Sequence, residues 1–344
     1  MNSAQWETLT KVISGERLKE PPIGFIIDSP RLPGWYKSTP LEYFADAAIW
    51  FDSNLKAIKE FPEVIFLPGF WSEYGMCTEP SAFGSKLVWF ETSHPHPARI
   101  LEDHAAPAAV KKPNVSTDGL LPLTLKRLKI YDRKIRESGH MTKFAVSRGP
   151  LNIASFLYGT TELMLAMAMA PDDVKKGLDT ITEFITDWIS LQMETIPGID
   201  GILILDDIIG FLGDEDYRQF VQPYLKKIYG SFNVSVRFLH NDAAGLVCAP
   251  YLKEAGINLF NFSFNHSFRE MKELTGDSVT LLGNLPPRDV LAAGTEEDVR
   301  NGVREMMHSV EDHSRIIWSC GGGMPPDVST ENIKAFITAV KEYK

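Results

Sequence analysis

The stretch GILILDD, residues 201–207, is apolar on both faces of a strand and ends on two adjacent carboxylates. A strand of this kind must be buried on both faces, which is typical of parallel sheets flanked by helices. Similar runs recur from residue 143 onward, each followed by a segment of helical period. The six runs are KFAVSRGP, GILILDD, VSVRFLHND, NLFNFSF, VTLLGNL and RIIWSCGGG. This alternation predicts βα units around a parallel sheet.

Two further apolar runs, IGFIID (23–28) and EVIFLPG (63–69), bring the number of expected strands to eight. The sequence therefore predicts an α/β fold, a (β/α)8 TIM barrel with an N-terminal elaboration. We expect residues 1–344 to form a single domain, in which residues 1–140 contribute long, aromatic-rich loops around the active site. The segment 102–122 has the composition of a surface loop or linker.

Helical periodicity is clearest in two segments between the expected strands. Apolar residues recur at helical spacing after Pro171, from Val174 to Trp188. Thr295 and Asp298 have the spacing of a capping box at the start of another helix. Pro223 is expected to kink the helix that it interrupts.

Composition excludes several classes of function. The chain of 344 residues carries 45 acidic and 35 basic side chains, which argues against general affinity for nucleic acids. No apolar run approaches the roughly 20 residues needed to cross a bilayer. The first 20 residues lack the apolar core of a signal peptide, so we expect a cytoplasmic protein. Three cysteines do not suggest a disulfide framework. Homo-oligomerisation is left open.

Polar residues at the ends of the expected strands are candidates for a metal site. His240 and Asp242 point to the same face of their strand because side chains alternate with period 2. Cys320 ends another strand, just before three glycines. Imidazole, carboxylate and thiolate all bind Zn²⁺, and three protein ligands leave one position open for a substrate. A hydrogen-bonded His–Asp pair and a buried, inert thiol are the structural alternatives.

Other strand ends and loops supply candidates for catalysis and binding. Asp206 and Asp207 are expected to act beside the metal or on the substrate; their structural alternative is bonding to backbone amides. Glu73 is a candidate fourth ligand or catalytic carboxylate from the other half of the chain, and a solvated loop acid is its alternative. Asn284 and His266 are expected to line the same site at the ends of the strands. Their structural alternative is hydrogen bonding to backbone groups of the loops.

Several of these motifs resemble the uroporphyrinogen decarboxylase superfamily. The motifs are GILILDDIIGFLGDEDYRQFVQPYLKKI, FLHNDAAG, YLKEAGINLFNF, LLGNLPP and WSCGGGMPPDVSTENIKAFI, between residues 144 and 343. The resemblance implies a (β/α)8 barrel. Decarboxylases of the superfamily carry an arginine-rich motif near the N-terminus that binds the carboxylates of the porphyrinogen, and this chain has PRLPGWYKSTP there instead.

The residues resemble more closely the zinc-dependent corrinoid methyltransferase branch. Its coenzyme M members bind zinc through a His-x-Cys pair and a distant Cys, and the matching positions are His240, Asp242 and Cys320. The carboxylate in place of the first cysteine favours an oxygen-bound substrate. The resemblance thus implies a methoxyarene:corrinoid protein methyltransferase, the O-demethylase component, in which zinc activates the ether oxygen. The corrinoid would be carried by a partner protein, because the motif Asp-x-His-x-x-Gly is absent.

Aromatic residues of the first segment are expected to wall a methoxylated aromatic substrate such as a methoxybenzoate. Core packing is the alternative for each. The candidates, with Asn284, are Trp35, Tyr36, Phe70, Trp71 and Tyr74, together with Phe83. Two other functions stay open. One is the coenzyme M or tetrahydrofolate side of the same methyl transfer, and the other is a non-catalytic barrel that binds a small molecule.

Overall fold

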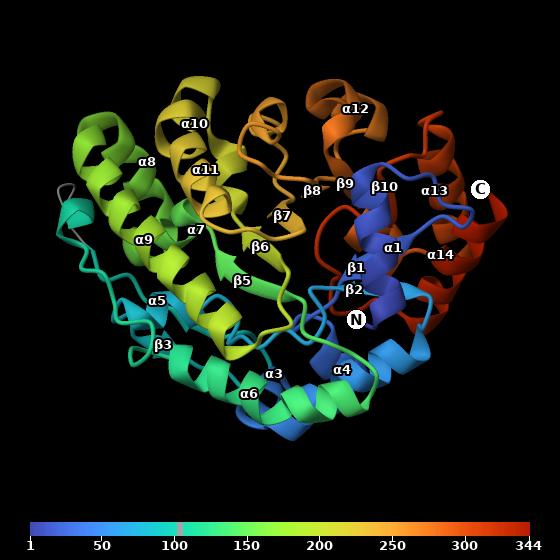
Figure 1. Ribbon diagram of the computed structural model, residues 1–344, viewed down its shortest axis with the longest axis horizontal. Coiled ribbons are helices and arrows are strands. Elements are labelled where there is room, and N and C mark those ends of the chain that lie inside the picture. Colours follow the sequence, from blue (N-terminus) through green and yellow to red (C-terminus); the bar gives the residue numbers. More distant parts are fainter. Residues whose placement is uncertain (102–105) are drawn as a thin grey trace.

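The computed structural model describes residues 1–101 and 106–344. In this part of the chain, eight parallel strands form one curled sheet that is surrounded by helices (Figure 1). The hydrogen-bonded order is β2-β1-β10-β9-β8-β7-β6-β5, so β1 and β10 are neighbours although they lie far apart in the sequence. The strands are β1 (Ile23–Ile26), β2 (Val64–Leu67), β5 (Phe144–Arg148), β6 (Gly201–Leu205), β7 (Val236–Asn241), β8 (Leu259–Phe262), β9 (Thr280–Leu285) and β10 (Ile316–Cys320). The predicted (β/α)8 barrel class is confirmed, and each predicted run contains a strand.

Side chains fill the sheet on both faces, which explains the doubly apolar runs. Inside the curl, Leu203 and Leu205 pack with Phe238 and residues of the other strands. Helix α1 (Ser3–Ser14) adds Leu9 and Val12 to this inner cluster. The outer face packs against the surrounding helices in a second, larger cluster. The side chains that can reach solvent or a ligand are therefore expected mainly at the ends of the strands.

The helices of the second half follow the predicted periodicity. They are α7 (Pro150–Tyr158), α8 (Thr160–Met169), α9 (Pro171–Thr195), α10 (Asp214–Phe220), α11 (Gln222–Gly230), α12 (Phe268–Thr275), α13 (Glu296–His308) and α14 (Thr330–Glu342). The capping box of Thr295 and Asp298 is present at the start of α13. Two helices, α10 and α11, meet at Val221 where a single kinked helix was expected, and Pro223 lies in the first turn of α11, where proline is best accommodated.

The first 140 residues are more helical than the sequence suggested. They contain α2 (Leu32–Trp35), α3 (Pro40–Ala45), α4 (Ala47–Glu60), α5 (Thr78–Ala82) and α6 (Leu121–Glu137), a short hairpin of β3 (Leu87–Val88) and β4 (His96–Pro97), and the 3-10 turn η1 (Ala106–Ala109). Three of the segments expected as loops form the short helices α2, α3 and α5; α2 and α3 have a proline in the first turn, and Thr39 caps α3. Residues 102–105 of the expected surface loop lie outside the described residues.

Four further short turns complete the described chain. They are η2 (Asp207–Phe211), η3 (Ala249–Tyr251), η4 (Gly276–Ser278) and η5 (Pro287–Ala292). Of these, η2 and η5 directly follow β6 and β9 at the carboxyl ends of the strands. Among the helices that the structure describes, none has the length and apolar character that crossing a bilayer requires.

Candidate metal and substrate site

A cavity of ≈ 750 Å³ lies at the carboxyl ends of the strands. Its volume is within the range of roughly 300–1,000 Å³ that is usual for small-molecule sites. Loops after β1, β2, β6, β7, β9 and β10 line it, together with residues 92–94. Its polar side chains include Asp28, Ser29, Glu73, His94, Arg148, Asp207, His240 and Asp242. Its apolar lining includes Ile26, Pro30, Pro33, Pro40, Met76, Leu205, Pro287, Met324, Pro325 and Pro326.

One histidine and two carboxylates converge in this cavity from neighbouring strands. Nε2 of His240 lies 3.6 Å from Oδ1 of Asp207 and 4.0 Å from Oδ2 of Asp242. One ligand atom from each of the three residues falls within 4.8 Å of the other two. Burial raises the pKa of Asp207, which the nearby His240 lowers and the Asp242 carboxylate raises. The predicted convergence of His240 and Asp242 is thus present, and Asp207 joins them.

Asn261 on β8 fixes the orientation of the His240 imidazole. Oδ1 of Asn261 lies 2.7 Å from Nδ1 of His240, while the amide nitrogen of Asn261 donates to the carbonyl of Leu282. Because the amide oxygen can only accept, Nδ1 carries the proton and Nε2 presents its lone pair to the cavity. This is the arrangement in which a histidine binds a metal, with the second ring nitrogen held by an outer partner. The residues present therefore fit a divalent metal such as Zn²⁺.

Replacing Asn261 with alanine is expected to weaken metal binding by roughly 10–100-fold, because the imidazole loses the partner that fixes its tautomer. Metal affinity is measured by competition with a chromophoric chelator. Asn258→Ala is the matched control, since Asn258 also bonds backbone groups next to β7 and β8 but at their amino ends. Equal affinity in the two variants would contradict the role of Asn261.

Cys320 ends β10 close to this group, but its thiol lies outside it. Its side chain is fully buried, and Sγ donates to the carbonyl of Gly322 at 3.4 Å. Burial, together with the charge of Asp242, raises the pKa of the Cys320 thiol to about 12. Gly322 has φ +139, and a Cβ added there would meet Oδ2 of Asp242 at 2.4 Å. The loop after β10 therefore touches Asp242 through its glycine backbone.

Asp206 is oriented away from the cavity. Its side chain is fully buried, and Oδ2 accepts a hydrogen bond from the backbone N–H of Leu151 at 3.0 Å. This contact satisfies the first turn of α7. Gly149 precedes that turn, and a Cβ on it would meet Asp206 at 2.3 Å. Of the two adjacent carboxylates, Asp206 holds a helix in place and Asp207 faces the cavity.

A second polar cluster, made of Asp28, Ser29, Glu73, His94 and Arg148, lines another part of the cavity. Nη2 of Arg148 donates to Oε2 of Glu73 at 2.8 Å, and both side chains are buried. The hydroxyl of Ser29 donates to Oε1 of Glu73 at 2.9 Å and lies 3.2 Å from Nε2 of His94. Glu73 is thus part of a buried ion pair and is not joined to the His240 group.

Asp28 is the second carboxylate of this cluster. Unlike Glu73, it accepts no hydrogen bond from a side chain or a backbone N–H of the described residues. Burial raises the pKa of Asp28 well above its ordinary value, and the Glu73 carboxylate raises it further, while Arg148 lowers it. The folded protein therefore binds this proton more tightly than the unfolded chain. Ionisation of Asp28 weakens the fold, so this unfavourable contribution is complete above the raised pKa and fades as the pH falls towards 3.8.

Asp28→Asn is expected to raise the free energy of unfolding at pH 8 by about 1 kcal/mol, since the variant removes the charge of a half-buried carboxylate to which no described group donates a hydrogen bond. The gain should shrink as the pH falls and Asp28 becomes protonated in the parent. Urea denaturation of both proteins between pH 4 and pH 8 measures it. A difference that does not change with pH would show that Asp28 is ionised throughout.

The aromatic residues expected to wall the substrate pack against other side chains of the protein, and none of them is among the described residues that line the cavity. Phe70 stacks on Phe51 with ring centroids 5.5 Å apart, and Phe83 meets Phe184 edge to face. Trp35 donates from Nε1 to the hydroxyl of Thr330. Three more rings face cations: Tyr36 with Lys56, Trp71 with Arg148 and Tyr74 with Arg127.

Trp71 is the aromatic candidate with the closest link to the cavity. The guanidinium carbon of Arg148 lies 5.0 Å from the Trp71 ring centroid, so the ring makes a cation–π contact with Arg148. Asn284 and His266 contact each other, since the side-chain amide of Asn284 donates to the carbonyl of His266. Nε2 of His266 bonds the carbonyl of Ala244. These two residues satisfy loop backbone and are not among the residues lining the cavity.

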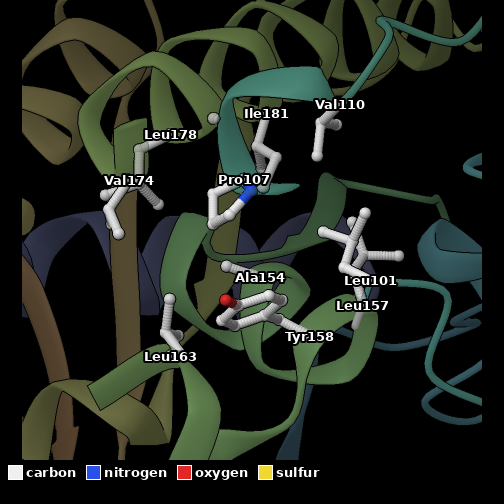
Figure 2. Close-up of a pocket in the computed structure, with 11 residues that line it drawn as sticks. Leu101, Pro107, Val110, Ala154, Leu157, Tyr158, Leu163, Val174, Leu178 and Ile181 are labelled. Carbon is white, nitrogen blue, oxygen red and sulfur yellow. The ribbon is translucent and has the colours of Figure 1, made fainter. Parts of the chain in front are cut away.

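Figure 2 shows a second cavity, of ≈ 10 Å³, between η1, α7 and α9. Pro107 of η1 lies over Leu178 and Ile181 of α9, and Leu157 and Tyr158 of α7 face it from below. A Cβ on Gly177 would meet the carbonyl oxygen of Pro107 at 2.6 Å, so glycine allows η1 to approach α9. None of the predicted site residues is among the described residues that line this cavity. It is a packing gap in the core, and the larger cavity is the functional candidate.

Asn261, Asp28 and Arg148 are the site residues that the sequence analysis missed. Asp28 ends the run IGFIID and Arg148 ends β5, so both carry the strand-end signal that pointed to His240. Applying that signal to every strand would have found them. Asn261 lies inside a strand, and no pattern within its own segment shows that it faces His240 on β7.

Comparisons with known proteins agree with this architecture. The family model for uroporphyrinogen decarboxylase (URO-D) matches residues 5–343. A uroporphyrinogen decarboxylase from Dichelobacter nodosus is 23% identical over 347 residues, which cover 96% of either chain. Another, from Chloroherpeton thalassium, is 29% identical over 182 residues, which are 50% of this chain and 49% of the relative.

A solved structure described as a methyltransferase from Methanosarcina mazei superposes with a TM-score of 0.80. The two sequences are 20% identical, and the alignment covers 97% of each chain. At this identity the likeness concerns the fold. The match of the family model over nearly the whole sequence carries the assignment, and the chain belongs to the uroporphyrinogen decarboxylase (URO-D) family.

Proposed function

We propose that this protein is a methyltransferase that moves the methyl group of a methoxylated aromatic compound to Co(I) of a separate corrinoid protein. The observation that carries the proposal is the group formed by His240, Asp207 and Asp242 at the carboxyl ends of the strands. A lone pair on Nε2 of His240, with Nδ1 held by Asn261, is suited to a Zn²⁺ ion and has no role in holding the barrel together.

The proposal assigns the following bond changes. The methyl carbon–oxygen bond of the ether breaks, Co(I) provides the electron pair of the new cobalt–carbon bond, and the oxygen keeps the pair of the broken bond. The oxygen then takes a proton to form a phenol. When Zn²⁺ is bound, it supplies Lewis acidity towards the leaving oxygen, which stabilises charge that develops in the transition state.

The chain's own residues would supply the remaining chemistry. Asp28 lines the same cavity, and because burial raises its pKa well above the ordinary value, its carboxyl group would be the proton donor to the leaving oxygen. Arg148 would link the two polar groups electrostatically, because it pairs with Glu73 and its charge also lowers the pKa of Asp207. The proline and methionine side chains of the lining exclude water and leave room for an aromatic ring.

The partner would approach the carboxyl ends of the strands, where the methyl group is presented. Exposed apolar side chains follow two of these strands, Phe211 in η2 after β6 and Phe264 after β8. Exposed aromatic residues of this size are common in protein interfaces. The proposal also places the protein in the cytoplasm, where we expect the reduced corrinoid partner.

A methyl-transfer assay tests the proposal directly. Purified protein is mixed with a corrinoid protein held in the Co(I) state and a series of methoxybenzoates, and the methyl–cobalt absorption is followed. We expect methylcobalt and the matching phenol to form in equal amounts. Methyl transfer only with coenzyme M or tetrahydrofolate would reject the methoxyarene assignment, and decarboxylation of uroporphyrinogen without methyl transfer would reject the reaction class.

A further inference from the structure

We infer that the third metal ligand beside His240 and Asp242 is the carboxylate of Asp207, and that Cys320 is not a ligand. This inference rests on the proposed function only in requiring a divalent metal at this site. The ion would then be held by one imidazole and two carboxylates, a set without sulfur. Neither the family comparison nor the spacing of the motifs assigns Asp207 to the metal.

The distances favour Asp207. Two ligands that each lie about 2.1 Å from a tetrahedral zinc are separated by roughly 3.4 Å. The observed separations from Nε2 of His240 are 3.6 Å to Asp207 and 4.0 Å to Asp242. All three atoms lie within 4.8 Å of one another, so rotation of the carboxylates would bring them to one ion.

Two of the three side chains, those of His240 and Asp207, are also held in place by hydrogen bonds. Asn261 fixes the imidazole of His240, and Oδ1 of Asp207 accepts a hydrogen bond from the backbone N–H of Asp242 at 3.3 Å. The His240 side chain is 8% exposed, and those of Asp207 and Asp242 are 35% and 39% exposed. The two carboxylates therefore reach the cavity, where a fourth position would stay open for a substrate.

Cys320 has a different environment. Its side chain is fully buried, and the residue is not among those that line the cavity. The thiol proton is used in a hydrogen bond to the carbonyl of Gly322 within the same loop. To bind a metal, the side chain would have to give up this bond and leave the core cluster in which it packs. Asp207 needs no such rearrangement.

The ligand set has a chemical consequence that can be measured. Carboxylates are harder ligands than thiolates, so this site should accept Zn²⁺, Co²⁺ and Mn²⁺ with less preference for zinc than a thiolate site shows. Co²⁺ serves as a probe, because a bound thiolate gives an intense charge-transfer band in the near ultraviolet and oxygen or nitrogen ligands do not.

The experiment compares Co²⁺-loaded full-length proteins by dialysis against the metal and by near-ultraviolet absorption. The parent and Cys320→Ser are expected to bind one equivalent with no thiolate band. Asp207→Ala and the nearly isosteric Asp207→Asn should bind the ion more weakly than the parent by at least the 10–100-fold typical of losing an outer partner. Asp242→Cys should gain the band, which proves that the probe detects a thiolate here. Asp289→Asn, an exposed acid on η5, is the control for loss of charge.

A thiolate band in the parent that disappears in Cys320→Ser would overturn the inference and leave the proposed methyl transfer intact. Full affinity in both Asp207 variants would also overturn it. A parent that binds no divalent metal would refute both this inference and the metal-dependent reaction. Circular dichroism of each variant confirms that the barrel is folded, so loss of metal is not mistaken for loss of structure.

Discussion

Replacing His240 with alanine is expected to abolish metal retention and methyl transfer while leaving the barrel folded. The affinity should fall by more than the roughly 10–100-fold that follows from removing an outer partner, because a ligand itself is lost. Two carboxylates, Asp207 and Asp242, would remain without the nitrogen that lies between 3.6 Å and 4.0 Å from them. The cost in stability should be about 1–3 kcal/mol, since Asn261 loses a buried partner.

Metal content after dialysis and the rate of methylcobalt formation measure this prediction. His308→Ala is a suitable control, because His308 is an exposed histidine in the last turn of α13. It should keep both metal and activity. A His240→Ala protein that retains a full equivalent of metal would remove His240 from the site, and with it the reason for placing a metal in this cavity.

Arg148→Ala is expected to cause the largest loss of stability, about 3–5 kcal/mol, because removing one partner of a buried ion pair leaves the other charge uncompensated. Arg148 is the cation that donates to Glu73, and its backbone N–H donates to the buried Glu79. Asp28 also lies within the field of its guanidinium. Without that cation, the buried Glu73 and Glu79 and the half-buried Asp28 lose a nearby positive charge, so the destabilisation should grow as the pH rises and they ionise.

Urea denaturation at pH 5 and pH 8 measures the effect. The matched control is Arg133→Ala, which breaks an exposed pair with Glu137 on α6 and should cost no more than about 1 kcal/mol. If Arg148→Ala were as stable as this control at pH 8, then Glu73 and Asp28 would be neutral there, and Arg148 would not stabilise the cavity wall.

The fold follows from the sequence because its signals are local. Strands covered on both faces must be apolar throughout, and the runs around Ile202 and Ile317 show this without reference to any other segment. Period 2 also places His240 and Asp242 on one face, and both line the cavity. Both the apolar pattern of the strands and the shared face of His240 and Asp242 depend only on residues within one strand.

The missing parts of the site depend on contacts between elements. Nothing in the dipeptide Asp206-Asp207 indicates which carboxylate faces the cavity, since that choice is made by the first turn of α7, which Asp206 bonds. The sequence suggested Glu73 as a functional carboxylate. It could not show that Glu73 forms an ion pair with Arg148, because the two residues lie 75 positions apart in the sequence. The aromatic residues were assigned to a substrate wall because their composition suits one, whereas rings such as Phe70 pair inside the core.

The central claim is that a divalent metal sits in the cavity at the carboxyl ends of the strands and is held by His240. A crystal of the protein loaded with zinc, measured on both sides of the zinc absorption edge, tests it most directly. The account predicts one anomalous peak within bonding distance of Nε2 of His240 and of the Asp242 carboxylate. A fully loaded crystal with no peak in this cavity, and its zinc elsewhere on the molecule, would contradict it.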